Sequence, residues 1–240
     1  MTFAAALRSS VGKKYLMGIT GLIWVGFTIG HLIGNYLIFA GRNPFNEYAF
    51  FLEHVGHGVL VYVAEAGLIV ALLTHIINGI QVALFDKGAA RPKGYQRTGN
   101  AGGPSRKSVF SQYMIVSGSM LLIFLIVHIA TLKFGLGTTA GKVNIGDQEF
   151  RDLYGLVVDY FANPAWVAFY VFIMCMLMFH LKHGVWSAFQ SLGLINSRIY
   201  PGLVTGSVVF AILLALGFIA LPVSIYALHD QFMRPQGGIF

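Results

Sequence analysis

Five long apolar segments are the feature that most restricts how this chain can fold. They lie at about residues 15–40, 58–85, 109–134, 164–190 and 202–227. Each is long enough to supply the ~20 apolar residues that a membrane-spanning helix needs. Each must also be helical, because lipid offers no hydrogen-bond partners to the backbone of an isolated strand. The sequence therefore predicts an all-α integral membrane bundle of five transmembrane helices, which we expect to form a single domain over residues 1–240.

The composition agrees with a membrane protein. The chain is 56% hydrophobic and 10% charged, whereas soluble domains carry about 25% charged residues. Its net charge is +7. However, the basic residues lie beside the apolar segments and no nucleic-acid motif is present, so a nucleic-acid partner is excluded. The single cysteine, Cys175, excludes a disulfide framework and iron–sulfur ligation by this chain.

Two segments between the spans read as polar loops, residues 86–108 and residues 135–163. Lysine and arginine concentrate on one side of the predicted bundle, and this side should be cytoplasmic. The N-terminus is then cytoplasmic and the C-terminus outside. The side rich in basic residues carries Arg8, Lys13, Lys14, Lys87, Arg91, Lys93, Arg97, Arg106, Lys107 and Arg198. The other side carries Arg42, Lys133, Lys142, Arg151 and Arg234.

Four of the eight histidines lie well inside four different spans: His31, His75, His128 and His180. Ionisable residues at such depth are costly and by default mark function. A single histidine of this kind could simply form a hydrogen bond between helices. Four such histidines on four helices weaken that explanation. His31 and His128 fall toward the predicted outer side, and the other two toward the inner side. At about 1.5 Å of rise per residue, the two levels are roughly 15 Å apart.

Two histidines at each of two levels predict bis-histidine ligation of two b-type haems. His31 and His128 would hold the outer haem, and His75 and His180 the inner one. An iron with two imidazole ligands has no open coordination position, so such haems transfer electrons. Each ligand's other ring nitrogen should find a hydrogen-bond acceptor, such as a carbonyl one turn back.

The two histidines of the inner level each begin the pattern His-x-x-(Asn/His)-Gly. Residues at i+3 and i+4 share the helix face of residue i. The polar residue of the pattern is therefore predicted to contact a haem, for example a propionate, and the glycine to let the macrocycle approach the backbone. The residues are His75, Asn78 and Gly79 in the second span and His180, His183 and Gly184 in the fourth. His183 is a rival to His180 as the ligand, but the match with Asn78 favours His180.

Gly26, Gly30 and Gly34 repeat at four-residue spacing in the first span. This stripe predicts a groove beside His31 that a haem could use. Close packing of small residues against another helix explains the same spacing, and both readings can hold together.

Haem propionates need cations near the membrane surfaces. Positive-inside topology or snorkelling explains each candidate equally well. For the inner haem the candidates are Lys182, Lys87, Arg91, Arg106 and Arg198, and for the outer haem Arg42 and Lys133. His54 and His57 are predicted to be interfacial, and His229 receives no role.

As a set, these residues resemble the one-subunit, di-haem cytochrome b anchor of succinate:quinone oxidoreductases, meaning succinate dehydrogenase and fumarate reductase. The resemblance covers nearly the whole chain, and its most specific part is the fourth-span pattern His-x-x-His-Gly-x-Trp-Ser-x-Phe-Gln. The residues that carry it are Gly30-His31, His75-Ile-Ile-Asn78-Gly79, His128 and His180-Leu-Lys-His183-Gly184-Val-Trp186-Ser-Ala-Phe-Gln190.

The resemblance implies a complex in a bacterial cytoplasmic membrane. A flavoprotein subunit and an iron–sulfur subunit would dock on the cytoplasmic face, against the basic segment 86–108 with Arg91, Lys93 and Arg97. Electrons would pass from the iron–sulfur clusters to the inner haem, the outer haem and then a quinone, with menaquinone expected. The direction reverses in a fumarate reductase. This chain would carry haem and quinone chemistry only and would not bind succinate.

Glu65 is an unpaired-looking carboxylate inside the second span, toward its outer end. A carboxylate at that depth is expensive, so Glu65 is a candidate for handling the protons of the quinone. Glu53, at the outer edge, is a second candidate. The alternative is that Glu65 only forms a hydrogen bond within the bundle.

Three other functions fit parts of the pattern. A di-haem cytochrome of a formate dehydrogenase or hydrogenase would hold the same haems but have another soluble partner. A transporter with a histidine proton relay would hold no haem, and the sequence shows no inverted repeat with broken helices that would favour it. A purely structural anchor without haem would not need four histidines matched in depth.

Overall fold

The computed structural model describes residues 2–86, 113–137, 140–234 and 238. Within these residues, five helical stretches are long and apolar enough to cross a membrane. They are Ser10–Ala40, Val59–Phe85, Met114–Lys133, Pro164–Ser191 and Tyr200–Ala227. The predicted five spans are therefore confirmed, with ends that agree to within a few residues. The direction in which they cross the membrane stays a prediction.

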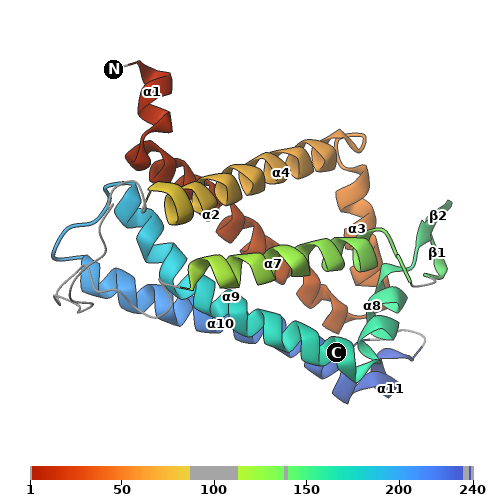
Figure 1. The fold of residues 1–240 in the computed structure, drawn as a ribbon. Helices are drawn as coiled ribbons and strands as arrows, with labels where there is room; N and C mark the ends of the chain where they lie inside the picture. Colours follow the sequence, from red (N-terminus) through yellow and green to blue (C-terminus); the bar gives the residue numbers. More distant parts are fainter. Residues whose placement is uncertain (1, 87–112, 138–139, 235–237, 239–240) are drawn as a thin grey trace. The chain divides into compact units, whose positions relative to one another are not determined.

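Figure 1 shows the helices and strands coloured in the order in which they follow one another along the chain. The first half comprises α1 (Phe3–Arg8), α2 (Ser10–Asn35), η1 (Tyr36–Ala40), α3 (Arg42–His54), α4 (Val59–Ile80) and η2 (Gln81–Asp86). The second half comprises α7 (Met114–His128), η3 (Ile129–Lys133), β1 (Lys142–Ile145), β2 (Gln148–Arg151), α8 (Leu153–Phe161), α9 (Pro164–Ser191), α10 (Tyr200–Ala227) and α11 (His229–Phe232).

The ends of α9 and α7 follow local chemistry. α9 begins at Pro164, as predicted, because proline at the first helical position gives up no hydrogen bond. The side chain of Asn163 accepts a bond of 2.9 Å from the backbone N–H of Ala165 just inside that end. α7 ends at His128 and continues as the wider π-helical turn η3. Such turns occur often at functional positions.

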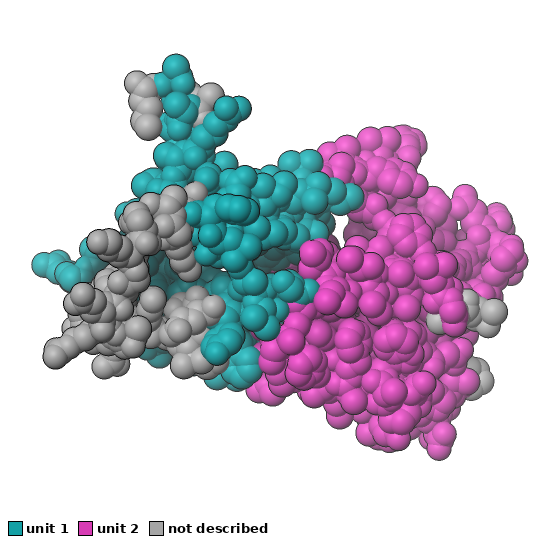
Figure 2. Space-filling view, viewed as in Figure 1, with its two compact units in different colours: residues 1–26, 67–119, 177–212 teal, residues 27–66, 120–176, 213–240 magenta. Residues whose placement is uncertain are grey.

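The chain divides into two compact units (Figure 2). Unit 1 consists of residues 1–26, 67–119 and 177–212, and unit 2 of residues 27–66, 120–176 and 213–240. The division passes through α2, α4, α7, α9 and α10, so each long helix contributes one part to each unit. That residues 1–240 form a single domain stays a prediction.

The prediction that residues 135–163 form only a polar loop is wrong. They contain the antiparallel hairpin β1–β2, in which Lys142 pairs with Arg151, and the helix α8. Gly146 occupies the turn with a φ of 60°, which glycine adopts without steric cost. The helix α3, between the first two spans, was also not predicted. It packs against α8 and η1.

The largest buried cluster lies in unit 2, around α8. Tyr154 and Val158 of α8 are fully buried, and Phe45 of α3 and Phe232 of α11 pack into the same cluster. Apolar residues surround most of α8, and six of its nine residues are buried, which is the pattern of a helix enclosed by a core. Asp152, a buried acidic residue of the segment predicted as a polar loop, has a structural role.

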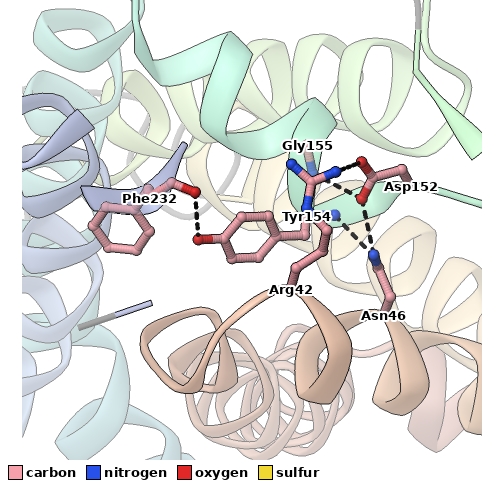
Figure 3. A network of polar contacts seen from close by, with 6 residues as sticks. All are labelled: Arg42, Asn46, Asp152, Tyr154, Gly155 and Phe232. Atoms are coloured by element: carbon pink, nitrogen blue, oxygen red, sulfur yellow. Dashed lines mark hydrogen bonds and ion pairs between the residues drawn. The ribbon is translucent and has the colours of Figure 1, made fainter. Parts of the chain in front are cut away.

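Asp152 joins α3 to α8 (Figure 3). One carboxylate oxygen forms an ion pair with Arg42, and the other accepts a bond of 2.8 Å from the side chain of Asn46. The backbone N–H of Gly155 donates to Asp152 at 3.0 Å, so Asp152 is the N-cap of α8. The Tyr154 hydroxyl donates to the carbonyl of Phe232 at 3.0 Å, which ties α8 to α11.

We expect Asp152→Ala to lower the free energy of unfolding by about 2 kcal/mol or more, because it breaks a buried ion pair and removes a helix cap. Thermal unfolding of the detergent-solubilised chain, or its resistance to protease within residues 140–161, measures this loss. The matched control is Glu149→Ala, which breaks the ion pair between Glu149 and Lys142. The two side chains are 58% and 68% exposed, respectively. The control should cost less than about 1 kcal/mol. Equal effects of the two substitutions would contradict the role of Asp152.

Candidate functional site

Unit 1 brings together His75 of α4 and His180 of α9. Their ring centres lie 6.4 Å apart, with 58° between the ring planes. The Nδ1 atom of His75 lies 3.1 Å from the carbonyl oxygen of Met17 in α2. A carbonyl can only accept a hydrogen bond, so Nδ1 carries the proton and Nε2 keeps its lone pair. The pairing of these two histidines agrees with the sequence prediction.

His180 is fixed by Ser117 of α7, whose Oγ lies 3.1 Å from Nδ1. The same Oγ lies 3.2 Å from the carbonyl oxygens of Tyr113 and Met114. Oγ can donate its single proton to one of these carbonyls and accept the bond from Nδ1–H of His180. His180 would then have the same tautomer as His75, with the Nε2 lone pair left for a metal.

Two glycines let neighbouring helices approach this pair closely. A Cβ added at Gly21 of α2 would lie 3.1 Å from Cε1 of His75. A Cβ added at Gly118 of α7 would lie 3.4 Å from Cε1 of His180. The absence of a side chain at both positions therefore leaves room for the two imidazole rings.

Unit 2 brings together His31 of α2 and His128 of α7, with ring centres 5.8 Å apart and 85° between the planes. Phe27 stacks on His31 at 5.3 Å, and Phe124 lies 5.3 Å from His128. The Nδ1 atom of His128 lies 3.0 Å from the hydroxyl oxygen of Tyr170 in α9. The predicted outer pair is therefore also close together, in apolar surroundings. We call the two sets the unit 1 pair and the unit 2 pair.

The residues that follow His75 and His180 in the two patterns lie on the same helices as these histidines and make other contacts. Asn78 donates a bond of 2.7 Å to the carbonyl of Thr74, one turn back on α4. His183 packs edge-on against Trp186 with ring centres 5.0 Å apart. Lys182 is half-buried on α9. Cβ atoms added at the two pattern glycines would meet only methionine side chains at ordinary distances, Met17 for Gly79 and Met114 for Gly184.

The glycine stripe of α2 divides into two environments. A Cβ at Gly26 or Gly30 would meet no atom within 4 Å, so both positions border open space. A Cβ at Gly34 would lie 2.6 Å from the ring of Tyr48 in α3, so Gly34 is required for helix packing. The groove reading and the packing reading of the stripe therefore apply to different glycines.

The description of Glu65 as unpaired is corrected, because its carboxylate forms an ion pair with Lys133 of η3. The two side chains are 37% and 46% exposed. Arg42, the other outer cation, is paired with Asp152. Both cations proposed for the outer haem thus already have carboxylate partners, which the sequence could not reveal because the partners are distant along the chain.

The remaining predicted residues take these positions. Glu53 and His54 are exposed on α3, and the ring of His54 stacks on Phe50 at 3.9 Å. His57 lies in the turn before α4 with a φ of 57°, and His229 begins α11. Arg198 is exposed before α10. Lys87, Arg91, Lys93, Arg97, Arg106 and Lys107 lie outside the described residues.

Sequence reasoning missed the groups that fix the histidines. The expected acceptor was a carbonyl one turn back on the same helix. The acceptors found for His75, His180 and His128 instead come from neighbouring helices. The one available signal was the presence of the polar residues Ser117 and Tyr170 inside apolar spans. The Met17 carbonyl has no signal in the sequence.

Comparison with known proteins agrees with the resemblance found in the histidine motifs. Residues 15–101 match the family "Succinate dehydrogenase/Fumarate reductase transmembrane subunit". The chain is 25% identical over 176 residues to the "Succinate dehydrogenase cytochrome b558 subunit" of Bacillus subtilis (strain 168), covering 72% of this chain and 76% of the relative. No solved structure matches this chain. The comparisons support a multi-pass membrane protein related to the cytochrome b subunits of these enzymes.

We expect His75, in the chain without bound metal, to carry its proton on Nδ1, because the Met17 carbonyl can only accept. Nitrogen-15 NMR of the histidine-labelled chain in detergent distinguishes the two neutral tautomers. The signal is assigned from its loss in His75→Gln, and the exposed His57 serves as the reference ring. A His75 signal showing the proton on Nε2 would contradict this geometry.

Proposed function

We propose that this chain is the membrane anchor and electron-transfer subunit of a succinate dehydrogenase or fumarate reductase, with one haem b held by each histidine pair. The observation that carries the proposal is the gathering of the four histidines inside the spans into two pairs, one within each compact unit. The family match and the Bacillus subtilis relative support the same class of protein.

The chemistry of the donor set fits haem iron. Among the described residues, no group of three or more His, Cys, Asp or Glu side chains gathers that could hold a bare metal ion. Two imidazoles suffice for an iron whose other four ligands belong to a porphyrin. The ring centres lie 6.4 and 5.8 Å apart in the two pairs, so each pair could supply both imidazoles to one iron.

The protein's contribution is to present neutral imidazoles with fixed orientation in an apolar environment. The Met17 carbonyl and the Ser117 hydroxyl hold the unit 1 rings with Nε2 available as the ligand atom. Phe27 and Phe124 line the unit 2 rings and exclude water from them. When bound, each haem would supply a one-electron carrier, and the surrounding groups would set its potential.

The path of electrons follows from the proposed orientation. The unit 1 pair would lie toward the cytoplasmic side, where an iron–sulfur subunit carrying a flavoprotein would dock on the basic segment. The unit 2 pair would exchange electrons with a membrane quinone, for which menaquinone is the expected form. The whole chain would then act as one di-haem domain whose two halves are joined by continuous helices.

Glu65 is the proposed proton-handling residue for the quinone. It belongs to unit 2, with the His31–His128 pair. Its carboxylate forms an ion pair with Lys133, the last residue of η3. Glu53, exposed on α3, remains the second candidate.

We expect a redox-titrated visible spectrum of the purified chain to resolve two low-spin haem components. His75→Ala or His180→Ala should remove one of them, and His31→Ala or His128→Ala the other, because each iron loses an axial ligand. The matched control is His57→Ala in an exposed turn, which should retain both components. A preparation without iron porphyrin, or ligand substitutions that leave both components intact, would refute the proposal.

We expect Glu65→Gln to lower quinone turnover of the complex at least tenfold while both haem spectra remain, because general acid–base catalysis contributes about 100-fold or more. Steady-state quinone reduction by succinate measures this. Glu149→Gln, which alters an exposed ion pair of the hairpin, is the control. Normal turnover in Glu65→Gln would contradict a role of Glu65 in proton transfer and would leave it only the structural ion pair with Lys133.

A further inference from the structure

Tyr170 of α9 is a buried residue to which the proposed electron transfer gives no role so far. Its side chain is 7% exposed, and its hydroxyl oxygen lies 3.0 Å from Nδ1 of His128. In the unit 1 pair, the groups that face Nδ1 are the backbone carbonyl of Met17 for His75 and the Ser117 hydroxyl for His180.

The ring of Tyr170 is held firmly in place. It packs at 4.9 Å from the ring of Phe161 and at 5.0 Å from the ring of Phe124, nearly perpendicular to both. The rings of Tyr160 and Phe169 lie at 6.0 Å. Because close-packed aromatic rings leave little room for displacement, the hydroxyl occupies a fixed point toward which the imidazole must turn.

The direction of the bond between Tyr170 and His128 follows from the proposed ligation. An Nε2 atom bound to iron leaves Nδ1, the second ring nitrogen, to carry the proton. The Tyr170 oxygen, 3.0 Å away, is then the acceptor of the bond from Nδ1–H.

We propose that Tyr170 is a positioning residue of the unit 2 haem: it holds His128 with the proton on Nδ1 and Nε2 toward the iron, and it lowers the haem's midpoint potential. The inference rests on the proposed function. An acceptor on the Nδ1–H group makes the imidazole a stronger electron donor. Stronger donation stabilises the oxidised iron relative to the reduced iron. Ser117 has the corresponding role for His180 in unit 1.

Each pair has its own partners on Nδ1, the Met17 carbonyl and the Ser117 hydroxyl in unit 1 and the Tyr170 hydroxyl in unit 2. The two haems would therefore have separately adjustable potentials, although each has two histidine ligands.

The test is Tyr170→Phe, which keeps the packed ring and removes only the hydroxyl. We expect both haems to be retained in the purified complex. The equilibrium constant for reduction of the unit 2 haem should increase two- to tenfold. A tenfold increase corresponds to a rise of about 59 mV in the midpoint potential of a one-electron carrier. The unit 1 midpoint should not change. Ligand substitutions in each pair assign the two midpoints.

Two further variants make the test specific. Ser117→Ala should raise the unit 1 midpoint and leave the unit 2 midpoint unchanged, which is the reciprocal pattern. Tyr226→Phe removes a hydroxyl from a 47% exposed tyrosine of unit 2 and should shift neither midpoint. A merely structural role of Tyr170 would not predict this selective pattern.

The outcomes separate the inference from the proposed function. If the wild-type chain binds no haem, the proposed function fails. If both haems are present and Tyr170→Phe leaves the unit 2 midpoint unchanged, or shifts both midpoints equally, the inference is overturned. If Tyr170→Phe loses the unit 2 haem, nitrogen-15 NMR of His128 in the haem-free wild-type and Tyr170→Phe chains decides. A His128 tautomer that differs between the two chains supports the inference, and the same tautomer in both overturns it.

Discussion

The structure depends on giving the imidazoles within the membrane fixed hydrogen-bond partners. A polar group without a partner costs several kcal/mol in lipid. The Nδ1 atoms of His75, His180 and His128 face Met17, Ser117 and Tyr170 respectively. Each partner belongs to a different helix from its histidine. The bonds that satisfy the rings therefore also join the helices, and they leave the Nε2 atoms available for ligation.

The second constraint comes from outside the spans. The cluster around α8 includes Phe161 and Tyr160, and these rings pack against Tyr170. α8 is in turn capped by Asp152, which binds Arg42 of α3. The point at which His128 finds its hydroxyl partner is thus defined partly by a helix that does not cross the membrane.

The sequence predicted what the lipid solvent dictates. The five spans follow from apolar length, and the four histidines stand out because ionisable side chains are rare at such depth. The segment that contains Asp152 was wrongly predicted to be only a polar loop, because the sequence does not reveal that Arg42 and Asn46 are partners of this carboxylate. The pairing of Glu65 with Lys133 and the contact of His128 with Tyr170 were not predictable either. Both join residues from separate helices, and only packing determines which ones meet.

Two of the long helices serve both pairs. α7 supplies Ser117 to unit 1 and His128 to unit 2, and α9 supplies His180 to unit 1 and Tyr170 to unit 2. In α7 the two residues are separated by about three turns at 3.6 residues per turn, so they share a face. One inserted or deleted residue between them would rotate one group by about 100° away from its partner. Insertions and deletions in related proteins should therefore be absent from these intervals within α7 and α9, and should occur in the connections between helices.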